Sequence, residues 1–232
     1  MSDPLRVAIV AEGITDKIVI QAAIERILSG SGFVLKQLQP EESLPFNERR
    51  GGWGGVYHWC RQAAERSGAA FAQDPLFATF DLLIVHLDAD VADGHYADAH
   101  IQDSVNDLPC AQPCPLPQAT TDPLRLVMLR WLGQVNLPPK TILCTPSKNT
   151  EAWVLCALYP QDGIVRSGDV ECHGTPQNQL QAKPSGGRTI SGGKKIVSMY
   201  LQRQSEITSA WTQVRASCTE ANRFSEDFEG AL

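Results

Sequence analysis

The sequence lacks any apolar run close to the ~18 residues that a membrane-spanning helix needs, so we expect no membrane segment. Residues 1–7 show no basic region followed by a long apolar core, which argues against a secretory signal and favours a cytoplasmic protein. The chain also lacks an excess of positive charge, because its net charge is −6 and its isoelectric point is about 5.4. Any contact with nucleic acid therefore needs a local basic surface rather than a general attraction.

A phosphate-binding loop of the NTPase kind is also missing. The segment Gly192-Gly193-Lys194-Lys195 is not a Walker A motif, because Arg188 stands where that motif has its first glycine and no Ser or Thr follows Lys194. The sequence therefore excludes an NTPase role for this chain.

Cysteine is present in an odd number without an export signal. The seven cysteines are scattered along the chain, which predicts reduced thiols rather than a disulfide framework. Cys110, Cys114, Cys172 and His173 form an alternative zinc-binding set. The second half of that set is a single Cys-His dipeptide, so we favour free thiols.

The order of apolar segments predicts one α/β domain. The chain has 232 residues, 43% of them hydrophobic, which suffices for one large domain or a domain with an insertion. Short β-branched runs alternate with helical periodicity, which indicates βαβ units and a mostly parallel, Rossmann-like sheet flanked by helices. We expect strands at 5–11, 33–38, 81–87 and 140–145, and helices at 15–30, 56–66, 123–133 and 151–158.

The remaining segments complete this domain. Thr15 and Asp122 are the expected N-caps of two of the helices. Residues 91–118 are expected to be a loop-rich insertion. We divide the chain into a catalytic core over 1–160 and a second part over 161–232, in which a basic Gly/Pro-rich loop leads into two C-terminal helices.

Carboxylates stand where the predicted strands end. Glu12 follows the first strand, and Asp16 lies in the first turn of the next helix. Asp88 and Asp90 follow the third strand and face the same side if the segment is extended, while Glu151 opens the helix after the fourth. The carboxyl ends of parallel strands meet at one edge of a sheet, so these five side chains can converge. Their repulsion predicts a site for a hard divalent cation.

Both the carboxylates and the neighbouring His86 have a second, purely structural interpretation. Asp and Glu are common in βα loops, where each carboxylate can simply cap a helix. Two such strand ends in one chain favour the cation site. His86 shares a strand face with Asp88, and is either a buried, hydrogen-bonded histidine or a member of the site.

The same residues carry a resemblance to a known family. The segment 12–16, Glu-Gly-Ile-Thr-Asp, follows an apolar strand, and a later apolar strand leads into Asp88-x-Asp90. This pattern resembles the Toprim domain of topoisomerases, bacterial primases and OLD-family (overcoming lysogenization defect) nucleases. The likeness covers most of residues 5–200 and is strongest to OLD-type nucleases and small stand-alone relatives. Ser147 and Glu151 resemble the family's downstream element, and Lys194 or Lys195 resembles its lysine.

The resemblance implies a metal-dependent DNA endonuclease that uses two Mg²⁺ or Mn²⁺ ions. Glu12, with a catalytic role, and Asp16 would hold one ion. The second would be held by Asp88, Asp90 and Glu151, with Ser147 beside them, and Lys194 or Lys195 would neutralise charge on the phosphorus. OLD proteins usually carry an ATPase domain before the Toprim domain. This chain has none, so ATP control would come from a separate ATPase partner, as in a multi-protein antiviral defence system.

A basic segment offers the surface that DNA binding needs. Residues 172–205 contain no Asp or Glu, and we expect their basic side chains to contact the phosphate backbone. A second basic group, Arg49 and Arg50, precedes the second helix and is followed by Trp53, Tyr57 and Trp59. These aromatic side chains either stack on bases or pack in the core. The alternative for the basic segment is a solvated loop. The nucleic-acid-binding candidates are Lys183, Arg188, Lys194, Lys195, Arg49 and Arg50.

Three functions are therefore considered. The leading one is the Toprim nuclease acting on DNA. The alternatives are another metal-dependent phosphoryl-transfer enzyme, such as a phosphatase, and a non-catalytic metal-binding interaction module. Whether the chain forms a homo-oligomer is left open.

Overall fold

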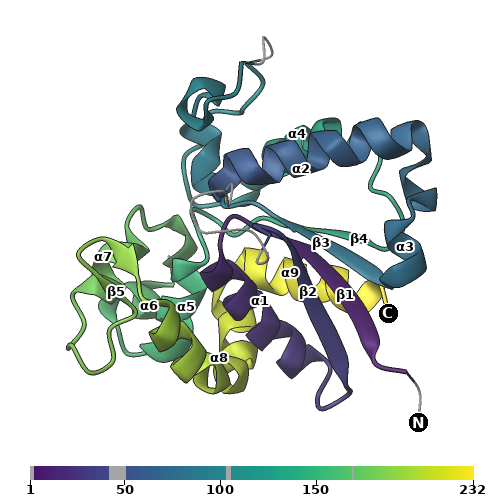
Figure 1. Ribbon diagram of the computed structural model, residues 1–232. Coiled ribbons are helices and arrows are strands. Elements are labelled where there is room, and N and C mark those ends of the chain that lie inside the picture. The colour runs from purple at the N-terminus through teal and green to yellow at the C-terminus, as the bar shows by residue number, and fades with distance from the viewer. Residues whose placement is uncertain (1–2, 42–50, 103–105, 169) are drawn as a thin grey trace.

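The computed structural model describes residues 3–41, 51–102, 106–168 and 170–232. Its centre is a four-stranded parallel sheet in the order β2-β1-β3-β4 (Figure 1). The strands are β1 (Leu5–Val10), β2 (Phe33–Gln39), β3 (Leu82–His86) and β4 (Thr141–Cys144). The α/β fold with a parallel, Rossmann-like sheet is thus confirmed, with strands close to the predicted positions.

Helices cover both faces of the sheet because its strands are apolar on both sides. Val7 and Ile9 pack on the face covered by α1 (Ile14–Ile27), α8 (Val197–Ser217) and α9 (Thr219–Gly230). Ala8 and Val10 pack on the opposite face, which α2 (Gly52–Ser67) and α4 (Gln118–Trp131) cover (Figure 1).

The other elements are short and lie in the connections. Before and after β3 the chain forms η1 (Gly68–Gln73), α3 (Leu76–Thr79), η2 (Ala89–Asp93) and η3 (Tyr96–Ala99). Beyond β4 a separate group of elements lies beside the sheet (Figure 1). It comprises α5 (Glu151–Leu158), α6 (Gly163–Ser167), η4 (Val170–Cys172), α7 (Pro176–Gln181) and the hairpin of β5 (Ile190–Ser191) and β6 (Lys194–Lys195).

Three helix starts differ from the prediction, and one of them is that of α2, which begins at Gly52 rather than at residue 56. The N-cap of α1 is Gly13, without a side-chain cap, and Thr15 lies inside the helix. Helix α4 begins at Gln118, so Pro123 is inside it and Asp122 is not its N-cap. The preference of proline for a first helical turn is only statistical, and here residues 118–121 extend the helix by a further turn. Asp122 instead forms an ion pair with Arg223 of α9.

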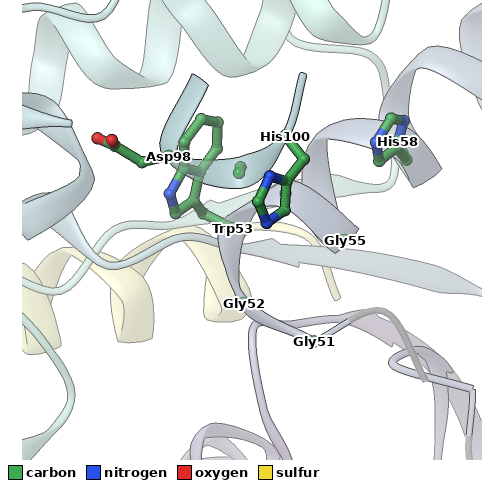
Figure 2. A pocket seen from close by; sticks show the side chains of 9 residues that line it. Gly51, Gly52, Trp53, Gly55, His58, Asp98 and His100 are labelled. Carbon is green, nitrogen blue, oxygen red and sulfur yellow. The ribbon is translucent and has the colours of Figure 1, made fainter. Parts of the chain in front are cut away.

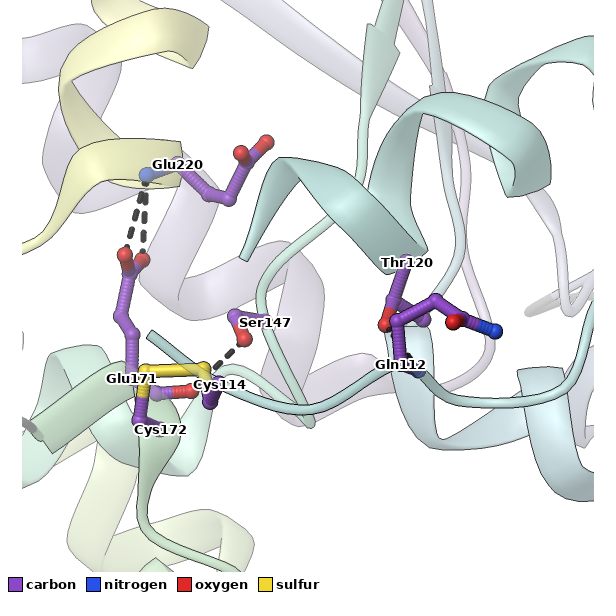
Figure 3. The surroundings of a disulfide bond; sticks show 7 residues. All are labelled: Gln112, Cys114, Thr120, Ser147, Glu171, Cys172 and Glu220. Atoms are coloured by element: carbon purple, nitrogen blue, oxygen red, sulfur yellow. Dashed lines mark hydrogen bonds between the residues drawn. A yellow bond between two sulfur atoms is a disulfide. The ribbon is translucent and has the colours of Figure 1, made fainter. Parts of the chain in front are cut away.

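The prediction of reduced thiols is wrong for two of the cysteines. Cys114 and Cys172 form a disulfide with a Cα–Cα distance of 5.5 Å (Figure 3). The two residues are 58 positions apart, and only the folded chain brings the loop before α4 beside η4. The zinc-binding set is excluded with it, because two of its three cysteines are bonded to each other. Cys110 is free and exposed.

Within the described residues, no helix combines the length and the apolar character that crossing a membrane requires.

Candidate functional site

The predicted convergence of carboxylates occurs at the carboxyl edge of the sheet. Glu12 follows β1, Asp16 lies in the first turn of α1, Asp88 follows β3, and Glu151 is the first residue of α5. Asp16, Asp88 and Glu151 are buried, and Glu12 is half-buried. The parallel connections of β1, β3 and β4 bring these residues to one edge, as the sequence predicts.

Hydrogen bonds join the three strand ends to one another. The amide of Asp88 donates to Oε1 of Glu12 at 2.8 Å. The amide of Thr150 donates to Oδ1 of Asp88 at 3.2 Å, and its hydroxyl donates to Oδ1 of Asp16 at 2.7 Å. Thr150 therefore ties the loop after β4 to both of the other junctions, which fixes the carboxylates relative to one another.

The backbone beyond β3 is held as firmly. The amides of Ala89 and Asp90 donate to the carbonyls of Pro146 and Lys148 at 3.0 and 2.9 Å, which continues the pairing of β3 with β4 past the strand ends. The side chain of Asp90 is exposed at the rim of the site. The two loops that carry the acidic residues consequently act as one unit.

Half of the site contains a lysine. We call Asp16, Glu151 and Lys195 the lysine cluster. The ammonium of Lys195 lies 2.8 Å from Oε1 of Glu151 and 3.3 Å from Oδ1 of Asp16. The hydroxyl of Tyr200 in α8 donates to the same Oε1 of Glu151 at 2.9 Å. Lys195 thus places a positive charge between two buried carboxylates.

The hairpin turn explains how Lys195 reaches the site. Gly192 and Gly193 have φ of 56° and 73°, values that side-chain-bearing residues rarely adopt, so two glycines suit this turn. The amide of Gly193 donates to Oε1 of Gln181 at 2.7 Å, which anchors the turn to the end of α7. Lys194 and Lys195 form β6, and α8 begins two residues later at Val197.

Charge in the lysine cluster is internally compensated. Burial acts to raise the pKa of Asp16, but the charges of Lys195 and His86 and the hydrogen bond from Thr150 lower it. Burial raises the pKa of Glu151 to about 7 against the opposing charge of Lys195. Burial acts to lower the pKa of Lys195, but its two carboxylate partners raise it well above the usual value. Lys195 is therefore a permanent cation of this site.

The other half of the site has no such cation. We call Glu12, His86 and Asp88 the histidine cluster; one ligand atom from each lies within 4.8 Å of the other two. Nε2 of His86 is 3.2 Å from Oδ1 of Asp88. Among the described residues, no lysine or arginine forms an ion pair with Glu12 or Asp88. The donor set of two carboxylates and one imidazole fits a divalent cation.

Burial, and after it the neighbouring carboxylates, disfavour negative charge on the acidic side chains here. Burial, and then the charges of Asp88 and Asp16, raise the pKa of Glu12 well above its usual value. Burial and the charge of Asp88 raise the pKa of Asp90 to about 6. Burial acts to lower the pKa of His86, but its contact with Asp88 and the charges of Asp88 and Asp16 raise it. A divalent cation would relieve this repulsion.

Other residues from the sequence prediction lie apart from the two clusters. The hydroxyl of Ser147 donates to the carbonyl oxygen of Glu171 at 2.6 Å, beside the disulfide (Figure 3). Lys183 forms an ion pair with Asp162 and lies over the ring of Tyr159. These two side chains are engaged in holding the group of elements around α6 and α7.

The remaining basic candidates differ in exposure. Lys194 neighbours Lys195 in β6 and is exposed, and Arg188 is half-buried. Neither forms an ion pair within the described part of the chain. Arg49 and Arg50 lie outside the described residues.

A cavity of about 720 Å³ lies at the start of α2. The amide of Gly52 donates to the carbonyl oxygen of Glu12 at 2.8 Å, which connects the cavity wall to the end of β1. Trp53 both lines the cavity and packs in the core, stacked on Trp131 with ring centroids 6.3 Å apart. The side chains of His58, Asp98 and His100 also line it (Figure 2). Tyr57, another of the aromatic candidates for nucleic-acid binding, is buried and belongs to the core.

Two members of the site were not identified from the sequence. Thr150 directly precedes Glu151 at the start of α5, so its position next to a predicted site residue could have identified it. Tyr200 lies 49 residues beyond Glu151 in α8, and nothing in the sequence connects them.

Comparison with known proteins leaves the family open. Neither the scan against protein-family models nor the searches of curated proteins and of solved structures returned a match to this chain. The site therefore has to be interpreted from its own geometry.

Proposed function

We propose that the chain is a divalent-metal-dependent DNA nuclease of Toprim type, a hydrolase of phosphodiester bonds. The observation that carries this proposal is the pairing of two unlike clusters on one sheet edge. One cluster gathers acidic side chains without a cation, and beside it the other holds a lysine. Phosphodiester hydrolysis needs both features, a cation to bind and polarise the phosphate and a further positive charge to stabilise its transition state.

The histidine cluster would hold the ion through Glu12, His86 and Asp88, with Asp90 at the rim. When bound, such an ion supplies Lewis-acid stabilisation of the phosphate and lowers the pKa of a bound water. The hydrogen bond from the Asp88 amide holds one oxygen of Glu12 in place. The protein thereby orients its ligands before the ion arrives.

The lysine cluster supports a role for Lys195 rather than Lys194. An ammonium has three donors, and its two carboxylate partners use two of them. The side chain is 32% exposed, so the third donor is free to meet a phosphate oxygen from solvent. Lys195 also stands between the two carboxylates, Asp16 and Glu151, that a two-ion arrangement assigns to different ions. We therefore propose one Mg²⁺ or Mn²⁺ ion, with Lys195 in place of the second.

DNA is the proposed substrate because two further basic residues, exposed Lys194 and half-buried Arg188, lie close to Lys195 in the sequence. Lys194 is its neighbour in β6, and Arg188 precedes the hairpin. A separate ATPase partner and a role in antiviral defence are proposed from the family resemblance alone.

The experiment is cleavage of supercoiled plasmid by purified protein with Mn²⁺. Wild-type protein is expected to nick or linearise it, Asp88→Asn to leave it intact, and the exposed control Glu65→Gln to cleave like wild type. Hydrolysis of p-nitrophenyl phosphate without plasmid cleavage would instead favour the phosphatase. If ion binding is measured without either reaction, the chain is a binding module.

A further inference from the structure

His86 is a buried polar side chain whose ring nitrogens have no hydrogen bonds. It is the last residue of β3 and has 0% exposed surface. Neither Nδ1 nor Nε2 has a hydrogen-bond partner among the described residues. Leaving such a group unsatisfied in the interior costs free energy, so a native protein rarely keeps one without a reason.

The ring points into the acidic cluster. Nε2 lies 3.2 Å from Oδ1 of Asp88, close enough for contact but without hydrogen-bond geometry. Its ligand atom, one oxygen of Glu12 and one of Asp88 all lie within 4.8 Å of one another. β3 is paired on both sides, with β1 and with β4, so the backbone that carries His86 is rigid. A ligand bond would satisfy the nitrogen in the position that it already has.

We propose that His86 is a nitrogen ligand of the divalent ion and that it shifts the ion preference of the site from Mg²⁺ toward Mn²⁺ and Co²⁺. The inference rests on the ion that the proposed function places in the histidine cluster, and it is independent of the substrate. Mg²⁺ favours oxygen ligands, whereas imidazole suits first-row transition ions. Exchanging one carboxylate for His86 therefore disfavours Mg²⁺.

A direct test is pulsed electron paramagnetic resonance of Mn²⁺ bound to the full chain. A coordinated imidazole couples its nitrogen nucleus to the electron spin of the ion. We expect a nitrogen modulation that changes when the protein is grown with ¹⁵N-labelled histidine. This measurement uses the wild-type sequence, so it does not depend on whether a variant folds. Bound Mn²⁺ without nitrogen modulation would overturn the inference.

A titration measures the effect on selectivity. We expect His86→Gln to retain Mg²⁺ binding and to reduce the ratio of Mn²⁺ to Mg²⁺ affinity by at least ~10-fold, a loss typical of altered metal-site partners. The matched control is His173→Gln, a half-buried histidine beside the disulfide, which should leave the ratio unchanged. An unchanged ratio in folded His86→Gln would contradict the proposed selectivity.

The result is separable from the proposed nuclease activity. Nitrogen-coordinated Mn²⁺ without plasmid cleavage would support His86 as a ligand and reject the nuclease. Plasmid cleavage by protein whose Mn²⁺ has only oxygen ligands would support the nuclease and reject His86 as a ligand. A chain that binds no divalent ion would reject both.

Discussion

The lysine cluster and the histidine cluster occupy the same sheet edge but balance their charge in different ways. The ammonium of Lys195 lies between Asp16 and Glu151, 3.3 Å from Oδ1 of the first and 2.8 Å from Oε1 of the second. Glu12 and Asp88 form no ion pair with a lysine or arginine among the described residues, and the His86 ring lies beside them. The difference teaches that acidic residues converging at strand ends do not all have to bind metal ions. In the lysine cluster the protein itself supplies the balancing cation, whereas the donor atoms of the histidine cluster could hold a metal ion.

The largest effect is expected from changing the histidine cluster. Asp88→Asn should lower cleavage by more than ~100-fold, since even residues that only support metal ligands cost 10–100-fold. Mn²⁺ at about 100 times its dissociation constant should stabilise wild-type protein by about 2.7 kcal/mol, and this gain should disappear in the variant. Thermal unfolding with and without Mn²⁺ measures it. Retained stabilisation in a folded Asp88→Asn protein would place the ion elsewhere.

The next effect should come from the lysine cluster, in turnover and in stability together. Lys195→Ala should reduce turnover by ~100-fold, as for loss of one transition-state donor. It should also destabilise the fold by about 3 kcal/mol, because two buried carboxylates lose their cation. The matched control Lys194→Ala removes an exposed lysine and should change stability by less than ~0.5 kcal/mol. Cleavage rates and urea unfolding of both variants give the comparison, and equal effects would refute it.

A smaller effect is expected from pH on the metal-free protein. Glu151 has a raised pKa of about 7 against a usual 4.5, so between these values the folded state binds more protons than the unfolded state. Stability should therefore fall as pH rises through this window, and Asp90, raised to about 6, should act in the same direction. Lys195 loses its contribution only at strongly alkaline pH. Unfolding curves from pH 4 to 8 measure the slope, and Glu151→Gln should flatten it; a rising stability would contradict this assignment.

The smallest effect is expected from Tyr200→Phe. It removes one hydrogen bond to Glu151 and should cost about 1 kcal/mol of stability. Because Tyr200 forms its hydrogen bond with Glu151 and, among the described residues, none with the histidine cluster, the affinity for Mn²⁺ should stay the same. Calorimetric titration of the variant checks this, and a large loss of affinity would mean that the two clusters are not separate.

Much of this site could be predicted because strand ends are visible in a sequence. Glu12 and Asp88 directly follow short apolar runs, Glu151 opens the helix after the fourth strand, and parallel connections bring such positions to one edge. Asp16 could be predicted as well, since the first turn of a helix that leaves a strand stays near the strand end. Local pattern and topology together suffice for these carboxylates.

The partners of the carboxylates could not be predicted, since they come from distant segments. Lys195 reaches Asp16 across 179 positions, and the choice between it and Lys194 depends on the face of a two-residue strand. The disulfide depends on a loop packing beside η4. His86 was visible as a strand residue, but its unsatisfied nitrogens are a property of the packed interior.

The number of ions bound per chain tests the central claim most directly. Calorimetric titration of metal-free protein with Mn²⁺ should give one ion per chain, abolished by Asp88→Asn and retained by Glu151→Gln. Two ions per chain, with one lost in each variant, would contradict the account. It would show that Lys195 yields its place between Asp16 and Glu151 to a second metal ion.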